Sequence, residues 1–364
     1  MATPTTTTTS RPNPEHIFNT LTAYQQSAAL QAGIELDIFT AIADGANTSV
    51  SLAAKIRAAE RGVRILCDYF AIQGFLTKEE GRYALTQESA IFLNRHSPAC
   101  VASMADFLLS ASGRKNFETL AEAVRKGGTA VAQGDNTKPN DELWVAFARC
   151  MAPLTTGSAG FIAELAGAAE GKPCSVLDIA AGHGMFGITI AKENPNAKIV
   201  ALDWAPVLQV ARENAEAAGV AGRMTFRSGS AFDMDLGGGY DVVLLTNILH
   251  HFDPPTCEKL MRRVHAALKR GGRAVTLEFV PNEDRISPPT AAGFSLIMLA
   301  STDSGDAYTF SQYEKMFLNA GFVKNDTASC SGNAAAGSRL RKIGNACEEK
   351  SKAPREKKKP GGKP

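Results

Sequence analysis

The stretch VLDIAAGHGMFG, residues 176–187, joins an apolar strand to a glycine-rich turn. Gly182, Gly184 and Gly187 have the G-x-G-x-x-G spacing, which lets a strand turn tightly into a helix and lets a ligand approach the backbone. Asp178 lies in the strand just before this turn. Because its carboxylate would repel the pyrophosphate of a dinucleotide, we expect a ligand that carries positive charge.

The chain after residue 173 alternates strands with helices. Five segments predict strands: CSVLDIA (174–180), AKIVALD (197–203), MTFRSG (224–229), YDVVLLTN (240–247) and GRAVTLEF (272–279). One of the helices between them is expected to begin at Asp253 as N-cap, followed by Pro254. This alternation predicts an α/β fold with a Rossmann-like, doubly wound parallel sheet, which binds ligands at the carboxyl ends of its strands.

Residues 15–105 predict a mostly helical domain. The short helix SLAAKI (51–56) and the longer helix ERGVRILCDYFAIQGF (60–75) precede LTKEEGRYALT (76–86), which is typical of two short strands around a polar turn. Helix, helix and β-hairpin together predict a winged helix. Residues 1–14, rich in Thr and Pro, are expected to form a disordered arm.

Charge is unevenly distributed along the chain. The net charge of the 364 residues is +2, yet residues 328–364 contain 10 Lys and Arg against 3 Glu, so the remainder is mildly acidic. An acidic body argues against nucleic-acid binding by the winged helix, where Arg57, Arg61 and Arg64 would be the candidates. The seven cysteines form no C-x-x-C pair, so no metal site is expected. We expect a cytoplasmic protein that does not enter a membrane.

Residues 328–364 are typical of a low-complexity basic tail. The segment after residue 323 is rich in Gly, Ala, Ser and Lys, and we expect no strand there. The sheet would then lack its last strand and expose an edge. A change of reading frame near residue 327 and a natural basic extension both account for this composition.

Several polar and aromatic residues follow the predicted strands. Asp203 ends the second strand, where its carboxylate can bind ribose hydroxyls, and Trp204 next to it offers a flat face of adenine size. The motif GSAF (229–232) follows the third strand and TNILHHF (246–252) ends the fourth. Adenosine joined to a short amino-acid chain with a cationic sulfur fits this set better than a nicotinamide dinucleotide does.

In this order and spacing, VLDIAAGHG, ALDW, GSAF, LLTNILHHFD and TLEFVP make the chain resemble the class I, S-adenosylmethionine-dependent small-molecule O-methyltransferases. The similarity extends from about residue 15 to about residue 322 and is clearest to the two-domain group of caffeic acid and bacterial polyketide enzymes. It implies a winged-helix dimerisation domain (15–105), a helical linker with the catalytic domain (106–327), and a homodimer. It also implies S-adenosylmethionine as cofactor and a hydroxylated small molecule as methyl acceptor, with no nucleic acid or membrane as partner.

The resemblance also assigns residues to the site. The expected cofactor-binding residues are Asp178, Ala180, Gly182, Gly184, Asp203, Trp204, Ser230, Ala231, Phe232 and Thr246. Three of them depart from the usual pattern: Ala180 replaces a glycine, Ser230 stands where many members have Asp, and Thr246 stands where plant enzymes have Lys. A second carboxylate expected near the base would fall on Ala307, with Asp306 beside it.

His250 takes the place of the general base in this family, and Glu278 that of the carboxylate that orients it. Since His250 and His251 are adjacent at a strand end, both rings are not expected in one pocket, and the choice between them stays open. An unpaired carboxylate in an apolar strand is unfavourable, which favours the pairing of Glu278 with His. His183, in the glycine loop, is expected to be exposed.

The expected substrate pocket consists of Trp144, Phe147, Met151, Asn247, Phe294 and Met298, although helical spacing of Trp144, Phe147 and Met151 fits a core stripe equally well. The leading hypothesis is an O-methyltransferase that acts on a small aromatic or polyketide-like molecule with His as general base. The alternatives are an NAD(P)-dependent oxidoreductase, based on G-x-G-x-x-G alone, and a non-catalytic winged-helix regulator with a cofactor-binding domain.

Overall fold

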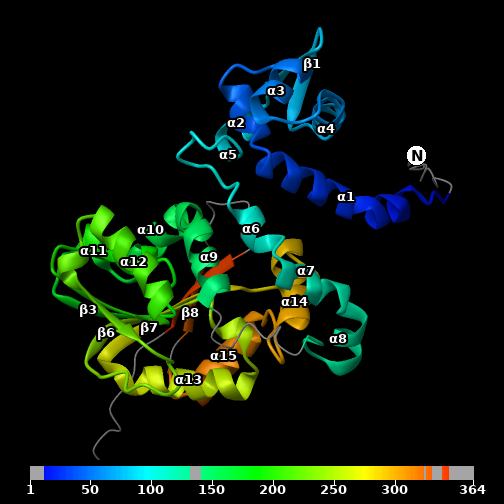
Figure 1. The fold of residues 1–364 in the computed structure, drawn as a ribbon. Coiled ribbons are helices and arrows are strands. Elements are labelled where there is room, and N and C mark those ends of the chain that lie inside the picture. Colours follow the sequence, from blue (N-terminus) through cyan, green and yellow to red (C-terminus); the bar gives the residue numbers. More distant parts are fainter. Residues whose placement is uncertain (1–11, 132–140, 324, 330–337, 344–364) are drawn as a thin grey trace, which may run out of the picture. The chain divides into compact units, whose positions relative to one another are not determined.

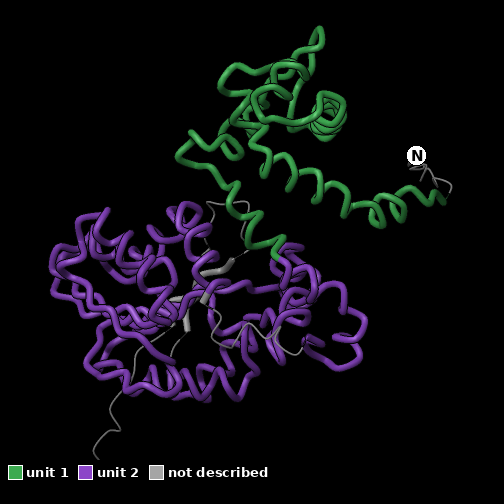
Figure 2. Tube along the Cα trace, in the orientation of Figure 1, with its two compact units in different colours: residues 1–110 green, residues 111–364 purple. Residues whose placement is uncertain are grey.

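The computed structural model describes residues 12–131, 141–323, 325–329 and 338–343 (Figure 1). The chain divides into two compact units, residues 1–110 and residues 111–364 (Figure 2). Most of the N-terminal arm predicted for residues 1–14 lies outside the described residues. In the part of the chain that the structure describes, no helix is long and apolar enough to cross a membrane.

The first unit contains the predicted helices and hairpin. Its elements are α1 (Glu15–Glu35), α2 (Ile38–Ala43), α3 (Ser49–Ile56), α4 (Glu60–Ile72), β1 (Leu76–Glu79), β2 (Arg82–Leu85), α5 (Gln87–Phe92) and α6 (Met104–Leu108). Strands β1 and β2 pair antiparallel, and the buried side chains of Phe39, Leu52 and Phe70 lie in one core. At Gly33 in α1 a Cβ atom would lie 2.5 Å from the ring of Phe70, so only glycine lets α1 approach α4 this closely.

The second unit is built on a seven-stranded sheet. Its strands are β3 (Cys174–Ile179), β4 (Ala197–Asp203), β5 (Met224–Ser228), β6 (Tyr240–Thr246), β7 (Leu268–Phe279), β8 (Asn325–Ser329) and β9 (Ser338–Ile343). The order across the sheet is β5-β4-β3-β6-β7-β9-β8, and β3 to β7 run parallel. All five strands predicted after residue 173 are present, which confirms the doubly wound α/β class.

Helices cover both faces of this sheet because side chains alternate along each buried strand. On one face α10 (Thr156–Leu165), α11 (Met185–Glu193) and α12 (Ala205–Ala217) pack against residues such as Val176 and Leu244. On the other face α13 (Pro254–Ala267) and α15 (Phe310–Asn319) pack against residues such as Leu177 and Val243. The connection changes face between β3 and β6, and such a switch point opens a crevice at the carboxyl ends of the strands.

The remaining helices of this unit are α7 (Ala111–Glu118), α8 (Leu120–Lys126), α9 (Asp141–Met151) and α14 (Pro289–Ser301), with short 3₁₀ turns η1 (Ala152–Thr155), η2 (Ala168–Glu170), η3 (Ala221–Arg223) and η4 (Leu249–His251). Helix α13 begins as predicted, since the side chain of Asp253 accepts a hydrogen bond from the Thr256 N–H at 2.9 Å. Turn η4 carries both candidate histidines and joins β6 to α13.

The expectation that no strand follows residue 323 is wrong. Strand β9 pairs antiparallel with β7, and β8 pairs antiparallel with β9, so β7 is not an open edge (Figure 1). Strands in a sheet are joined by backbone N–H and C=O groups, and strands near a sheet edge tolerate Lys and Arg. A search for apolar segments therefore does not detect β8 and β9. The basic tail predicted for residues 328–364 is interrupted by these strands; its other parts, 330–337 and 344–364, lie outside the described residues.

Candidate active site

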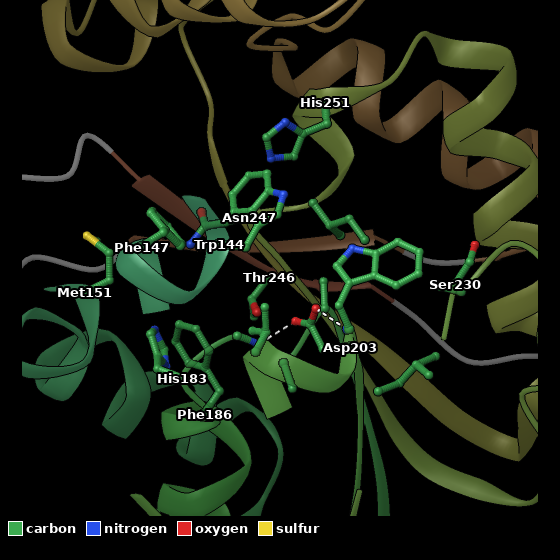
Figure 3. Close-up of a pocket in the computed structure, with 18 of the residues that line it drawn as sticks. Trp144, Phe147, Met151, His183, Phe186, Asp203, Ser230, Thr246, Asn247 and His251 are labelled. Atoms are coloured by element: carbon green, nitrogen blue, oxygen red, sulfur yellow. Dashed lines mark hydrogen bonds between the residues drawn. The ribbon is translucent and has the colours of Figure 1, made fainter. Parts of the chain in front are cut away.

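A cavity of about 190 Å³ lies at the carboxyl ends of β3, β4, β5 and β6 (Figure 3). Twelve of the expected site residues line it: Ala180, Gly182, Asp203, Trp204, Ser230, Ala231, Phe232, Thr246, Asn247, Trp144, Phe147 and Met151. The crevice predicted at the strand ends therefore collects side chains from four strand ends and from α9.

Asp203, the last residue of β4, binds two backbone groups at the cavity wall. Its Oδ2 accepts a hydrogen bond from the Gly182 N–H at 2.8 Å, and its Oδ1 accepts one from the Trp204 N–H at 2.7 Å. Burial raises the pKa of this carboxyl group to about 6, although these two bonds oppose the rise. Each oxygen keeps a lone pair, so the carboxylate can still accept hydrogen bonds from a pair of vicinal hydroxyls.

Asp178 lies elsewhere than expected. Its side chain is fully buried beneath the loop, does not line the cavity, and accepts a hydrogen bond from the Gly187 N–H at 3.2 Å. A Cβ atom at Gly187 would come within 2.7 Å of Ile199 and 3.1 Å of the Asp178 carboxylate, so this glycine permits close packing of α11. Burial, followed by the charge of Asp203, raises the pKa of Asp178 to about 7. The expected direct contact between this carboxylate and a cationic ligand is therefore not supported.

The glycine loop contains strained and tightly packed positions. Ala180 has φ of +54°, in the left-handed region that favours glycine, and this is the position where the resemblance expects a glycine. Gly182 and Gly184 also have positive φ values, +57° and +75°. A Cβ atom at Gly184 would lie 2.9 Å from Cβ of Ala211, so Gly184 serves helix packing and does not line the cavity.

His183 is buried, so the prediction that it is an exposed loop residue is wrong. Only 5 % of its surface is accessible, and it lines the cavity beside Phe186, whose ring centre is 5.5 Å away. Its Nδ1 accepts a hydrogen bond from the Met185 N–H at 3.1 Å. Burial lowers the pKa of the imidazole to about 4, which keeps the ring neutral at pH 7.

The loop after β6 has an unusual backbone at the cavity wall. Asn247 has φ of +53°, and its N–H donates to the Leu277 carbonyl oxygen at 2.8 Å. Its Oδ1 is buried without a hydrogen-bond partner. Strained backbone and an unpartnered buried acceptor are features that concentrate at binding sites, where a ligand completes the hydrogen bonding.

His250 and Glu278 form a buried pair at the start of η4. The His250 Nδ1 lies 2.5 Å from Glu278 Oε2, while Glu278 Oε1 accepts hydrogen bonds from the N–H groups of Ile248 at 3.0 Å and Leu249 at 2.8 Å. Because the carboxylate acts as acceptor, Nδ1 donates, and the lone pair of a neutral His250 is on Nε2. The pairing expected for Glu278 is present, and it leaves Nε2 able to take a proton.

His251 lines the cavity, whereas His250 does not. The two ring centres are 4.3 Å apart, and His251 contacts Trp144 edge to face at 5.5 Å. Burial and, to a smaller extent, the neighbouring His250 hold the pKa of His251 well below its usual value. Its Nδ1 is buried without a partner. As expected, the two rings do not share one pocket.

Phe294 and Met298 of α14 do not line the cavity. Phe294 packs on His250 with ring centres 4.9 Å apart and stacks on Phe279 at 3.9 Å, so it covers one side of the His250 ring.

The second carboxylate expected near the base is not found at the predicted place. Ala307 is fully buried, and Asp306 binds Arg285 at 2.9 Å. Asp306 therefore does not supply a second carboxylate to His250, and Glu278 supports the ring alone among the described acidic residues.

Sequence reasoning missed several residues that line the cavity: Thr155, Ala181, His183, Phe186, Leu202, Val207, Gly229, Ile248 and Phe252. Most are apolar residues in the first turn of α11 or α12 or next to a strand end. Their position at or just after the carboxyl ends of β3, β4, β5 and β6 was the available signal, because residues there face the crevice.

Comparison with known proteins identifies the family of this chain. A model of the O-methyltransferase domain matches residues 171–323, and a model of the O-methyltransferase dimerisation domain matches residues 18–95. A solved structure from Nostoc punctiforme PCC 73102, assigned as an O-methyltransferase, has 48% sequence identity and a TM-score of 0.87, and the match covers 92% of this chain and 100% of that chain. The chain belongs to the O-methyltransferase family. It is an S-adenosylmethionine-dependent O-methyltransferase, which excludes the oxidoreductase and the non-catalytic regulator as its class.

Two curated relatives of this O-methyltransferase come from Streptomyces. The 3-hydroxy-5-methyl-1-naphthoate 3-O-methyltransferase of Streptomyces sahachiroi is 25% identical over 316 residues, which are 85% of this chain and 89% of that protein. The tetracenomycin polyketide synthesis 8-O-methyl transferase TcmO of Streptomyces glaucescens is 27% identical over 327 residues, 88% of this chain and 94% of that protein. The O-methyltransferase thus aligns with these small-molecule enzymes over both domains.

Proposed function

We propose that this enzyme methylates a hydroxyl group of a small aromatic or polyketide-like molecule and that His250 is the general base. The observation that carries the proposal is the pair of His250 and Glu278 at the carboxyl end of β6, next to the cavity. The names of the Streptomyces relatives, a naphthoate and a polyketide methyltransferase, support the acceptor class.

The cavity residues fit S-adenosylmethionine. Asp203 keeps acceptor capacity for the ribose hydroxyls, and Trp204, Ala231 and Phe232 provide apolar surface for an adenine. Ser230, next to Ala231 in the cavity wall, supplies a hydroxyl group, whose oxygen already accepts a hydrogen bond from the Phe232 N–H at 3.1 Å. When bound, the cofactor supplies an activated methyl group on a sulfonium. The protein then has to align the acceptor and remove a proton from it.

His250 is suited to remove that proton. A phenol with a pKa near ~10 is about 0.1 % ionised at pH 7, so a base next to the hydroxyl raises the fraction that can react. Glu278 fixes the Nδ1–H tautomer of His250 and stabilises the imidazolium once Nε2 has taken the proton. General base catalysis of this kind contributes about 10²- to 10⁴-fold.

We further propose that the enzyme is a homodimer through the first unit. Four apolar side chains of α1, those of Ile17, Phe18, Leu21 and Tyr24, are each more than 60 % exposed. Apolar side chains that recur along one helix are unfavourable in water, and the dimerisation-domain match over residues 18–95 supports a second copy of this chain as the partner.

The function is tested by transfer of a labelled methyl group from S-adenosylmethionine to a panel of hydroxylated naphthoates, catechols and polyketide phenols. Each acceptor is paired with its own methyl ether, in which the hydroxyl is blocked. Label in the phenol and none in the ether is expected. Equal labelling of phenol and ether would show methylation at another atom, and no labelling with any phenol would contradict the acceptor class.

A further inference from the structure

His183 and Thr155 are polar residues of the cavity that the proposed chemistry does not use. They belong to separate elements, the glycine loop after β3 and the end of η1, yet both line the cavity. They expose only 5 % and 6 % of their surfaces. Turn η1 packs against α11, which begins two residues after His183, so Thr155 and His183 belong to neighbouring parts of the cavity wall.

The hydrogen bonds of His183 fix the direction in which it can bind a ligand. Nδ1 accepts the Met185 N–H at 3.1 Å, so the single proton of the neutral ring is on Nε2. The Asn214 side chain donates to the His183 carbonyl oxygen at 2.8 Å and holds the backbone in place. No described residue accepts a hydrogen bond from Nε2. His183 therefore presents an oriented N–H donor.

Thr155 presents a hydrogen-bond acceptor to the cavity, whereas His183 presents a donor. Its hydroxyl donates to the Ala152 carbonyl oxygen at 2.9 Å, a bond inside the 3₁₀ turn that uses the only hydrogen of the group. The lone pairs of Oγ1 are then available for a donor. His183 and Thr155 thus offer one donor and one acceptor to whatever occupies this part of the cavity.

The position of the pair follows from the proposed cofactor site. In Figure 3, Met151, His183 and Phe186 lie on one side of the cavity, and Asp203 and Ser230 lie on the other. With the ribose on Asp203 and the adenine toward Ser230, the amino-acid chain of the cofactor would extend toward His183. That chain ends in a carboxylate, which needs a donor, and an ammonium group, which needs an acceptor.

We propose that His183 and Thr155 bind the amino-acid end of the cofactor, His183 donating from Nε2 to the carboxylate and Thr155 Oγ1 accepting from the ammonium. This inference rests on the proposed cofactor site.

The test uses three ligands that share the adenosine part. S-adenosylhomocysteine carries both end groups, its decarboxylated analogue keeps only the ammonium, and 5′-methylthioadenosine has neither. Titration calorimetry on the full chain measures their affinities. A hydrogen bond to a charged group corresponds to about a tenfold to a hundredfold change in affinity, so the native protein should bind the three in that descending order.

Two substitutions separate the donor from the structural role of His183. His183→Asn places an oxygen where Nδ1 was, so it can still accept the Met185 N–H, but it lacks the donor at Nε2. His183→Gln can place an amide nitrogen near the Nε2 position. We expect His183→Asn to bind S-adenosylhomocysteine and its decarboxylated analogue equally, and His183→Gln to retain a preference for the former.

For Thr155 the matched pair is Thr155→Val, which has no acceptor, and Thr155→Ser, which keeps it. Thr155→Val should bind the decarboxylated analogue no better than 5′-methylthioadenosine.

The proposal is overturned if His183→Asn keeps the full preference for the carboxylate or loses affinity for all three ligands equally. Asp203→Ala is the separate control: it should weaken all three, and if it weakens none, the cofactor site itself is misplaced.

Discussion

A single carboxylate, that of Glu278, holds both the imidazole of His250 and the backbone just before it. Oε2 lies 2.5 Å from His250 Nδ1, and Oε1 accepts the N–H groups of Ile248 and Leu249 at 3.0 and 2.8 Å. With 0 % of Glu278 and 4 % of His250 exposed, water has little access to the pair. Orientation of the ring and conformation of turn η4 thus depend on the same side chain.

Replacement of Glu278 should therefore affect stability and turnover together. Glu278→Ala leaves two buried N–H groups unpaired and should destabilise the fold by several kcal/mol, since each unpaired group costs about 1–3 kcal/mol. Glu278→Gln keeps an acceptor oxygen and should lower the melting temperature less, while still slowing turnover because it no longer stabilises the imidazolium. Thermal unfolding and initial rates measure the two effects. Full activity in Glu278→Gln would show that the charge is not required.

His250→Ala should abolish turnover and leave the affinity for S-adenosylhomocysteine nearly unchanged, because His250 does not line the cavity. The rate with a phenol acceptor should fall about 10²- to 10⁴-fold and recover partly at higher pH, where the phenol ionises without a base. His251→Ala, the neighbouring control, should reduce the rate much less. An inactive His251→Ala variant together with an active His250→Ala variant would show that His251 is the base.

Binding of S-adenosylhomocysteine should weaken as the pH falls through about 6. The pKa of Asp203 in the empty cavity is raised to about 6, chiefly by burial. Hydroxyl donors of a ribose favour the ionised carboxylate, so the pKa falls on binding and a proton is released when the pH is below that value. Calorimetry at pH 7 and pH 5 should show up to about a tenfold loss of affinity. Asp203→Asn should bind S-adenosylhomocysteine more weakly at pH 7, and its affinity should not change between pH 7 and pH 5.

In the free protein the same carboxylate should affect stability in the opposite sense. A carboxyl group whose pKa is raised by folding stabilises the fold fully below its unfolded pKa, and this contribution is lost as the pH rises through the folded value. For Asp203 and Asp178 the folded values are about 6 and about 7, so the free enzyme should lose stability between about pH 4 and pH 7. A melting temperature that rises over this range would contradict the buried positions of both groups.

Ala180→Gly should stabilise the protein. At φ of +54° an alanine is strained by about 1–2 kcal/mol, whereas the extra freedom of glycine in the unfolded chain costs about 0.5–1 kcal/mol, which leaves a net gain of roughly 0.5–1 kcal/mol. The control is Ala181→Gly at a buried position outside the left-handed region, which should destabilise by about 1 kcal/mol. Equal destabilisation of both variants, measured by chemical unfolding, would contradict the strained loop.

Light scattering should find a dimer at micromolar concentration. The paired substitutions Phe18→Glu and Leu21→Glu place charge among the exposed apolar side chains of α1 and should shift the protein toward monomer. Gln25→Glu and Gln26→Glu on the same helix carry the same added charge and should leave the dimer intact. A native protein that is monomeric, or a dimer that survives the first pair of substitutions, would contradict an interface through α1.

The sequence by itself determined the parallel sheet, its five strands from β3 to β7 and the position of the cavity. These follow from local patterns: apolar strands, the glycine turn, and polar residues such as Asp203 placed just after a strand. The pairing of Glu278 with His could also be predicted, because a carboxylate within an apolar strand requires a partner. In each case the prediction depends only on residues within one short segment of the chain.

Tertiary structure alone decided the direction and burial of individual side chains. Asp178 turned out to lie under the glycine loop and His183 inside the cavity, since packing of α11 on the sheet, and not the loop sequence, sets their exposure. Whether His250 or His251 faces the cavity depends on the 3₁₀ turn that Glu278 holds. Strands β8 and β9 form by backbone pairing with β7, a long-range interaction that leaves no apolar signature in the chain.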